Sequence, residues 1–247
     1  MTTLNQSLEG GVLALELNRA DKRNAFDREL YAALTSALQA ADENPEVRVI
    51  RLGAKGDCFS AGNDIADFLA EPEQGRRTDP PLQLLQAMRA CRKPVVAEVN
   101  GKAVGIGATL LLHCDLIYAS ERAALIFPFV ALGLCPEGGS TQLIPQLAGH
   151  AKAFEWLVLG EPCKAVDAAQ AGLINAVLPQ EQLGAQVDKV VRRLASLDAT
   201  AVQQSRARLQ QAAGAQLDTL MQAEMDLFEQ LLEGDAAQQA LNAFVTR

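Results

Sequence analysis

The sequence predicts an α/β fold with a helical C-terminal part. Up to about Gly149, short apolar segments rich in β-branched residues alternate with segments whose apolar residues have helical spacing. From about Gly149 onward, the helical spacing predominates. We therefore expect a core over residues 1–195 that contains the functional site, followed by a helical region over residues 196–247. That region has little of its own to pack around, so it must dock on the core or on another subunit.

Composition excludes several classes of function. The chain has 247 residues, of which 49% are hydrophobic and 21% charged, enough to bury a core. The formal net charge of -8 predicts no nucleic-acid partner and no binding to anionic membranes. No apolar run reaches the roughly 18 residues that a membrane span needs. The five cysteines form no CxxC pair, which favours reduced thiols and a cytoplasmic location. No cluster of metal-ligating residues is present, so no metal is expected.

The N-terminal elements follow from local patterns. Alternation over residues 12–17 predicts a strand. Residues 18–24 form a polar turn in which three of seven residues are cationic; this turn is either a solvated loop or a docking point for a phosphorylated ligand. Asp27 is a suitable N-cap for an amphipathic helix that ends before Pro45. Residues 47–52 are rich in β-branched side chains and predict the next strand.

The middle of the chain contains two loops and further elements. Glycines and short polar residues over residues 53–65 predict an irregular loop, at the end of which Asp64 opens a short helix. Asp64 is either a helix cap alone, which needs no ligand, or a residue that also contacts a ligand. Residues 70–81 contain three prolines and predict a mobile surface loop. A helix over residues 82–91 and a strand over residues 95–99 follow. Residues 115–119 predict a further strand.

Two features between Asn100 and Gln142 could carry chemistry. A glycine-punctuated turn over residues 101–107 can present backbone N–H groups to a developing negative charge. Glu137 follows an apolar run and precedes Gly138-Gly139, so its carboxylate could move a proton. From these residues alone, the pattern favours a helix-start or surface carboxylate at Glu137. Burial would raise its pKa, and a helix that begins near Gly138 would oppose that rise, so the balance stays open.

The other ionisable residues give weaker signals. His113 and His150 lie in no Ser-His-Asp arrangement, and we expect His113 to be a core or helix-surface residue. Glu98 is a charged residue in an apolar strand. We expect it to be paired or interfacial, with a secondary catalytic role as the alternative. Asp115 should anchor the turn into the strand that follows it.

Four segments together resemble the crotonase family, the enoyl-CoA hydratase/isomerase superfamily. They are NRADKRNAF (18–26), FSAGNDIADF (59–68), NGKAVGIGATLLLHCDLIYAS (100–120) and PEGGSTQLIP (136–145). Each is weak alone, but the four occur in the family's order. The resemblance implies a crotonase-fold spiral of ββα units. It also implies that the C-terminal helices form a homotrimer, or a hexamer built as a dimer of trimers.

The resemblance further implies an acyl-CoA thioester substrate, with CoA as part of the substrate and no separate cofactor. By matching position, the backbone N–H groups of Asn63 and Ile106 would bind the thioester oxygen, and Gly62 and Gly105 precede them. Such pre-aimed donors contribute about 2.7–4 kcal/mol each. The remaining residues expected to bind the substrate are Lys22, Arg23, Ala25, Ala61, Asp64 and Ile65.

The reaction depends on which carboxylates are present. In the resembling hydratases two glutamates orient a water, and the matching positions here are Thr109 and Phe129, neither of which can act as a base near neutral pH. The sequence is more similar to the Δ3,Δ2-enoyl-CoA isomerase branch, where a lone glutamate in the position of Glu137 moves the proton. That similarity predicts an isomerase of unsaturated fatty-acid β-oxidation. The alternatives are an enoyl-CoA hydratase or another crotonase-family enzyme, and a non-catalytic acyl-CoA-binding module.

Overall fold

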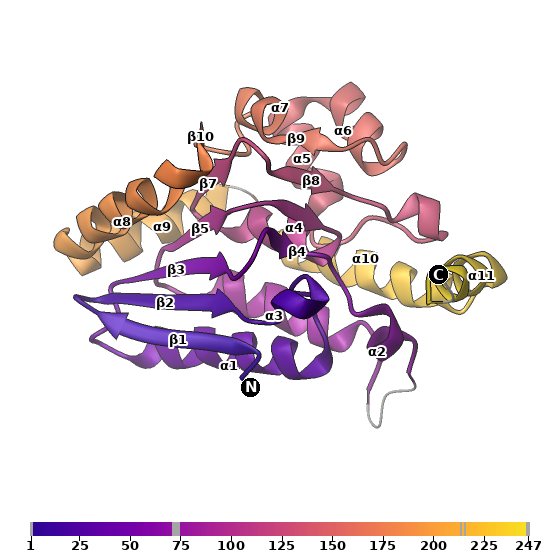
Figure 1. Ribbon diagram of the computed structural model, residues 1–247, viewed down its shortest axis with the longest axis horizontal. Coiled ribbons are helices and arrows are strands. Elements are labelled where there is room, and N and C mark those ends of the chain that lie inside the picture. The colour runs from indigo at the N-terminus through magenta and orange to yellow at the C-terminus, as the bar shows by residue number, and fades with distance from the viewer. Residues whose placement is uncertain (1, 71–74, 213, 215, 246–247) are drawn as a thin grey trace.

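A computed structural model describes residues 2–70, 75–212, 214 and 216–245 of the chain. Its strands form two sheets (Figure 1). The larger sheet has the order β1-β2-β3-β5-β7-β10 and the smaller one the order β4-β6-β8-β9. The large sheet consists of β1 (Leu4–Glu9), β2 (Val12–Leu17), β3 (Val49–Ala54), β5 (Val95–Val99), β7 (Leu116–Ser120) and β10 (Ala176–Leu178). The small sheet consists of β4 (Cys58–Ser60), β6 (Lys102–Val104), β8 (Ala124–Ile126) and β9 (Cys163–Lys164).

The chain alternates between the two sheets. After β3, β5 and β7 in the large sheet come β4, β6 and β8 in the small sheet, and helices follow each pair. From β2 to β10 the neighbours in the large sheet are parallel, and β4, β6 and β8 are parallel in the small one. Parallel strands require crossover connections, which the intervening helices supply. This arrangement confirms the expected spiral of ββα units.

The helices cover the sheets. The longer ones are α1 (Arg28–Glu43), α3 (Asp79–Ala90), α5 (Ser140–Ala148), α6 (His150–Leu157), α8 (Gln180–Ser196), α9 (Ala199–Ala212), α10 (Leu217–Leu232) and α11 (Asp235–Val245). The shorter ones are α2 (Ile65–Leu69), α4 (Ile106–Thr109), α7 (Ala165–Gln170) and the 3-10 turns η1 (Ala20–Lys22), η2 (Leu110–His113) and η3 (Val130–Leu132). Helix α8 buries Leu183, Val187 and Val191 against Val49 and Val96 of the large sheet. None of the helices in the described ranges combines the length and apolarity needed to cross a bilayer.

Most of the elements expected from the sequence are present. The Asp27 side chain accepts a hydrogen bond from the Leu30 amide at 2.8 Å and caps α1 as predicted. Several strands were not expected. Strands β1 and β8 were not predicted, β4 interrupts the loop expected over residues 53–65, and β6 lies inside the turn expected over residues 101–107. Strands β9 and β10 occur in the part expected to be helical. The loop expected over residues 70–81 gives way to α3 from Asp79, and its residues 71–74 lie outside the described ranges.

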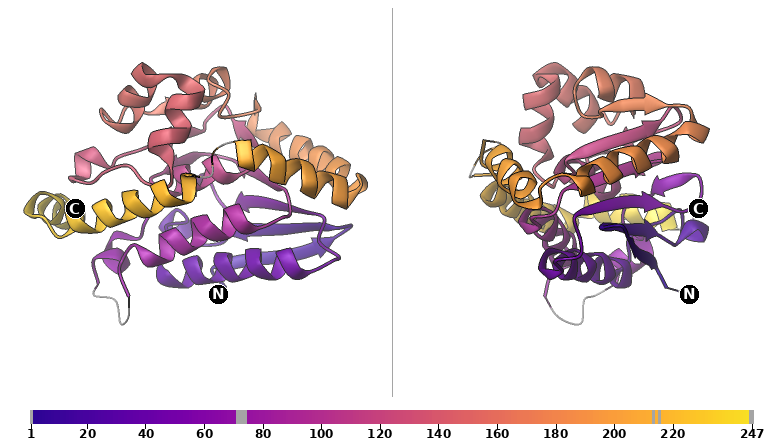
Figure 2. Two further views of the ribbon diagram at one scale, coloured as in Figure 1. Left: turned by 180° about the vertical axis from the view of Figure 1, so that it is seen from behind. Right: turned by 90° about the vertical axis from the view of Figure 1, so that its left-hand side faces the viewer.

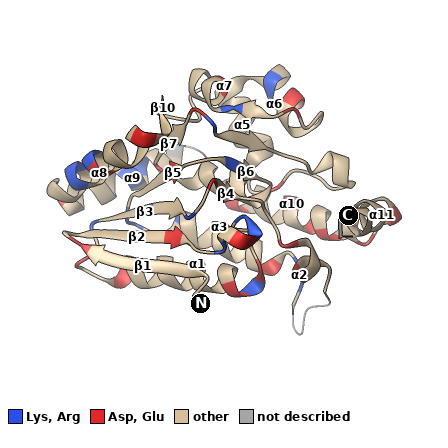
Figure 3. Ribbon diagram, viewed as in Figure 1, with Lys and Arg blue, Asp and Glu red and all other residues tan. Residues whose placement is uncertain are grey.

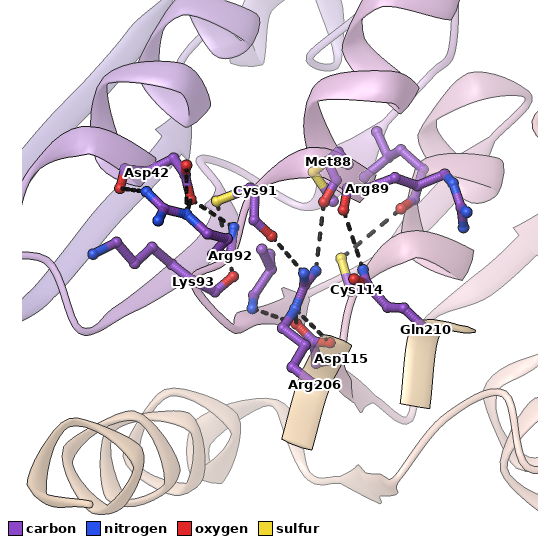
Figure 4. A network of polar contacts seen from close by, with 12 residues as sticks. Asp42, Met88, Arg89, Cys91, Arg92, Lys93, Cys114, Asp115, Arg206 and Gln210 are labelled. Atoms are coloured by element: carbon purple, nitrogen blue, oxygen red, sulfur yellow. Dashed lines mark hydrogen bonds and ion pairs between the residues drawn. The ribbon is translucent and has the colours of Figure 1, made fainter. Parts of the chain in front are cut away.

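Helix α9 is bound to the core by one buried cation (Figure 4). Arg206 donates from Nε to both carboxylate oxygens of Asp115, at 2.9 and 2.8 Å, and from its terminal nitrogens to the carbonyl oxygens of Cys91 and Met88. Asp115 also accepts from the Val95 amide at 2.7 Å, so it anchors the turn as expected. A view from behind shows α10 beside α3 (Figure 2). The predicted role of residues 196–247 in subunit contacts stays a prediction.

Candidate active site

A groove of about 540 Å³ gathers almost the whole set of predicted site residues. Its walls come from η1, the segment from β4 to α2, the turn from β6 to α4, η3, α10 and α11. Of the predicted residues, it is lined by Lys22, Arg23, Ala25, Ala61, Gly62, Asn63, Asp64, Ile65, Gly105 and Ile106. The family resemblance assigned to one site residues that lie more than 80 positions apart, such as Lys22 and Ile106. These residues line the same groove.

Glu137 lies in a smaller cavity that adjoins this groove. The cavity has a volume of about 10 Å³ and is lined by Glu137 together with Thr78, Pro81 and Met225. It shares its remaining lining residues with the groove, namely Asn63, Phe68, Ile106, Phe129 and Phe228. Phe68 and Phe129 each meet Phe228 edge to face, with ring centroids 6.1 and 6.2 Å apart. The carboxylate and the two candidate donor residues thus border the same apolar space.

The two candidate oxyanion donors are amides without a partner in the described part of the chain. Ile106 opens α4, where the first N–H groups have no intrahelical acceptor. Around Asn63, the Phe26 amide donates to the Gly62 carbonyl at 2.7 Å and the Asp64 amide donates to the Phe26 carbonyl at 2.8 Å. The Asn63 N–H therefore points away from that bridge. No described residue accepts a hydrogen bond from either amide.

The glycines before these donors allow the two loops to approach each other. Gly62 has φ 89° and Gly105 has φ 52°, conformations that favour glycine. A Cβ atom on Gly62 would lie 2.8 Å from the carbonyl oxygen of Val104. The Asn63 side chain is fixed as well, because Tyr31 Oη donates to its Oδ1 at 2.5 Å. The relative position of the two amides is thus set by backbone contact.

Burial controls the protonation of Glu137. The residue is 3% exposed, and desolvation is the largest cause that raises the pKa of its carboxyl from 4.5 to about 8. Thr109 Oγ1 donates to Glu137 Oε1 at 2.5 Å and opposes that rise, whereas the charge of Glu224 adds to it. Oε2 has no hydrogen-bond partner among the residues described.

The helix that follows Glu137 does not offset its burial, because another carboxylate occupies the helix terminus. Glu224, from α10, accepts a hydrogen bond from the Gly139 amide at 2.6 Å and a second from the Thr141 hydroxyl at the start of α5. A carboxylate at a helix N-terminus is stabilised by the helix dipole and screens it. The question left open by the sequence is thereby answered in favour of burial. Glu224 was not singled out from the sequence, since it looks like one polar residue of an amphipathic helix.

The cationic turn is divided between a structural role and the groove. Arg19 lies 2.8 Å from Asp27 and 3.1 Å from Asp64 in ion pairs, so Asp64 is paired and makes no side-chain cap on α2. Lys22 and Arg23 are exposed and line the groove. Figure 3 shows charged positions of both signs in η1. Two of the three cations are therefore free to meet an anionic ligand.

Asn24, which the sequence reading passed over, holds this turn in place. Its φ of 53° lies in the left-handed region that asparagine tolerates. Its buried side chain donates to the carbonyl oxygens of Lys55 and Cys58, at 2.9 and 2.8 Å, and accepts from the Arg19 amide at 3.0 Å. The one signal that could have revealed it is an asparagine at the last position of the polar turn.

Glu98 and His113 do not belong to the groove. Glu98 accepts from Arg51 Nε at 2.9 Å and lines a different cavity, with residues of β1, β2 and β3, which confirms that it is paired. His113 is buried, and desolvation lowers its pKa to about 4. The neutral ring lies 2.8 Å from the Gly138 carbonyl oxygen through Nε2, so it supports the turn next to Glu137. No group of three potential metal-ligating side chains occurs in the described ranges.

Known proteins resemble this chain over nearly its full length. A model of the family described as enoyl-CoA hydratase/isomerase matches residues 7–247. Enoyl-CoA delta isomerase 2 of Homo sapiens is 32% identical over 251 residues, with 99% of this chain covered and 64% of that relative's length. The 2,3-dehydroadipyl-CoA hydratase of Escherichia coli (strain K12) is 30% identical, with 100% and 97% covered. The solved structure of Pseudomonas aeruginosa OdaA has a TM-score of 0.95 at 39% identity, with 100% of both chains covered.

Proposed function

The chain belongs to the enoyl-CoA hydratase/isomerase family, and on that premise we propose that it is a Δ3,Δ2-enoyl-CoA isomerase. One observation carries the proposal. Glu137 borders a cavity that the candidate donors Asn63 and Ile106 also line, while Thr109 and Phe129 stand where the resembling hydratases have glutamates. A reaction that needs one carboxylate, and no reacting water, suits this arrangement better than hydration does.

The reaction needs the carboxylate to move one proton twice. The ionised Glu137 takes a proton from C2 of a 3-enoyl-CoA, and the electron pair of the C–H bond passes into a dienolate whose oxygen accepts hydrogen bonds from the Asn63 and Ile106 amides. The protonated carboxyl then returns that proton to C4, giving the 2-enoyl-CoA. C2 and C4 lie close together on one face of the dienolate, so one flexible group reaches both. The apolar lining excludes bulk water from the intermediate.

The groove suggests how the CoA part is held. Lys22 and Arg23 are exposed cations at its mouth in a chain of net charge -8, and they would meet the phosphates of CoA. The acyl chain would lie against Phe68, Phe129 and Phe228. CoA enters as part of the substrate, and the proposed reaction needs no separate cofactor.

We also propose a cytoplasmic homotrimer, or a hexamer built from two trimers. Large apolar side chains are exposed on the outer helices of this chain, which favours burial between subunits. Those on α5, α6 and α7 and the loops between them are Leu147, Phe154, Leu159 and Val166, and those on and before the C-terminal helices are Leu197, Leu209 and Leu227. Sedimentation analysis of the purified protein tests this state, and a monomer would contradict it.

The decisive variant is Glu137→Gln, which keeps the shape of the side chain and removes the base. We expect turnover of a 3-enoyl-CoA to fall about 10²-fold or more, the contribution of a positioned acid/base. Binding of a saturated acyl-CoA should be kept, because the groove residues are untouched. Rates are measured by product analysis, and binding by calorimetry.

Glu98→Gln is the matched control, since it makes the same change in a carboxylate outside the groove. Turnover should stay near the wild-type value. The proposed reaction is wrong if the wild-type protein mainly adds water to 2-enoyl-CoA, which would make it a hydratase. A protein that binds acyl-CoA and turns over neither ester would be a binding module.

A further inference from the structure

Thr78 is a buried residue at the start of α3 whose hydroxyl has no structural task. A threonine that precedes a helix usually accepts a hydrogen bond from a backbone amide in the first turn. Here the Thr78 side chain makes no such bond. Its backbone is held instead, because its amide donates to Glu229 Oε2 at 3.0 Å and its carbonyl accepts from the Leu82 amide at 3.1 Å. The hydroxyl therefore has no hydrogen-bond partner among the described residues and can bind another molecule.

Two buried oxygens of the small cavity's lining residues lack hydrogen-bond partners. Thr78 is 1% exposed and Glu137 is 3% exposed, and both residues line that cavity. Neither Thr78 Oγ1 nor Glu137 Oε2 has a partner in the described part of the chain. Buried polar groups without a partner are costly, so they usually mark a bound water or ligand.

The cavity has the size and chemistry of a water site. Its volume of about 10 Å³ is close to the space that one water needs. A water there could donate to the carboxylate oxygen and exchange a hydrogen bond with the threonine hydroxyl. The rest of the lining is mainly aromatic or aliphatic, with Phe68, Pro81 and Met225 among its members. Such walls limit where a polar ligand can bind, so they favour a single position.

We propose that Thr78 is a positioning residue, and that its hydroxyl and Glu137 Oε2 together bind one water molecule that orients the carboxylate toward the groove. Thr109 holds Oε1, and the Thr78 water holds Oε2, so both oxygens of the base have a partner before the substrate arrives. The catalytic meaning of this water rests on the proposed isomerase function. Its presence does not.

Several titratable groups interact with the same carboxyl and must stay constant in a test. The charge of Glu224, on α10, raises the pKa of Glu137, and the charge of Glu137 in turn raises the pKa of Tyr31, on α1, and of the Cys135 thiol. Glu229 contacts only the backbone of Thr78 in the bonds described. A substitution at Thr78 leaves all four in place, so it changes the hydrogen bonds of Oε2 alone.

The test is a titration of Glu137 in the free protein, followed by carboxyl-carbon NMR and assigned by loss of the signal in Glu137→Gln. Thr78→Val keeps the side-chain shape and removes the hydroxyl, whereas Thr78→Ser keeps the hydroxyl. Since a water that donates to the carboxylate stabilises its ionised form, Thr78→Val should raise the proton affinity of Glu137 about fivefold or more. Thr78→Ser should titrate like the wild type.

Turnover and stability separate this role from a purely structural one. For Thr78→Val, kcat on a 3-enoyl-CoA should fall about tenfold with little change in KM, while the melting temperature is kept because the hydroxyl makes no hydrogen bond to another described residue. If Thr78→Val does not fold, Thr78→Ala is titrated instead. A crystal structure of the free wild-type protein should show the water, and that of Thr78→Val should lack it.

Two results would overturn the proposal. One is an unchanged Glu137 titration in Thr78→Val, and the other is a Thr78→Ser variant that behaves like the valine variant. Both are read in the free protein, without turnover. A failure of the isomerase assay with an altered titration in Thr78→Val would therefore reject the proposed reaction and keep the water site.

Discussion

A hydrogen bond from Thr109 links Glu137 to α4, the helix that begins at Ile106. The threonine hydroxyl, on α4, donates to Glu137 Oε1 at 2.5 Å. A hydrogen bond to the ionised form lowers a carboxyl pKa, so this contact keeps the value near 8 from rising further. Thr109, which stands where the resembling hydratases have a glutamate, is thus a hydrogen-bond partner of Glu137.

We expect Thr109→Val to raise the pKa of Glu137 above its value of about 8. The ionised fraction at neutral pH then falls about tenfold for each pKa unit, and the rate with it. The loss should shrink at higher pH, where the carboxyl ionises again. Profiles of kcat/KM against pH for Thr109→Val and the hydroxyl-keeping Thr109→Ser measure this shift. Identical midpoints in the two variants would count against the contact.

The proposed base, Glu137, could be named from the sequence, but its environment could not. The PEGG segment and the residues at 109 and 129 pointed to Glu137. Its burial depends on Thr78, Met225 and Phe228, which are 59 to 91 positions away along the chain. Local patterns carry no information about such contacts. For that reason the residues alone favoured a helix-start or surface carboxylate, and only the family resemblance pointed to a base at Glu137.

Helix α5 takes its N-terminal cap from a different helix. The buried Glu224 on α10 accepts from the Gly139 amide and the Thr141 hydroxyl. This link joins α10 to the turn that carries Glu137. One carboxylate therefore caps a helix, docks a second helix and repels the charge of the base.

For Glu224→Gln we expect two effects. Loss of the charged cap should lower the free energy of unfolding by about 1–2 kcal/mol. Loss of the like charge, together with an unscreened helix terminus, should lower the pKa of Glu137. Urea unfolding and the pH profile of turnover measure the two. Glu233→Gln, at the exposed end of α10, is the control and should change neither.

Elements with a long repeating apolar pattern were predicted well. Strands that are exposed or only two or three residues long were predicted poorly. The spacing of leucines gave α1, and β-branched runs gave β3 and β5. Strand β1 was missed because most of its side chains are exposed and polar. Strands β9 and β10 have only two and three residues and exist through their partners β8 and β7. Such strands depend on tertiary contact more than on propensity.

Stability of the whole molecule should depend on pH through its buried groups. Glu137 keeps its proton up to about pH 8, whereas in the unfolded chain it ionises near 4.5. A raised carboxyl pKa means that stability falls as pH rises between those two values. His113, with a pKa lowered to about 4, acts in the opposite direction below about 6.5 because it must charge on unfolding. Above about pH 6.5 His113 is mostly neutral in the folded and the unfolded chain, so the effect of Glu137 predominates there.

Between pH 6.5 and 8 we therefore expect the wild-type protein to lose about 2 kcal/mol of unfolding free energy, which is the effect of roughly one proton. Glu137→Gln cannot ionise, so its loss should be much smaller and it should be the more stable protein at pH 8. Urea unfolding at both pH values gives the comparison. Parallel losses in the two proteins would show that another group is responsible.

The C-terminal helices show what helical spacing can predict and what it cannot. Their apolar faces predicted that they dock on something. The spacing could not reveal that Phe228 of α10 and Leu241 of α11 line the groove in the same chain. An amphipathic pattern records that a face is buried, and only the fold determines what covers it.

The groove is lined from Asp21 near one end of the described chain to Leu241 near the other. Lys22, Arg23 and Asn63 are synthesised early, and Glu137 is added when little more than half of the chain exists. The aromatic wall at Phe228 and the contact of Leu241 emerge last. A nascent chain can therefore complete both sheets while one side of the groove is still missing. The groove becomes complete only when translation has passed α11 and this helix has docked against α2 and η3.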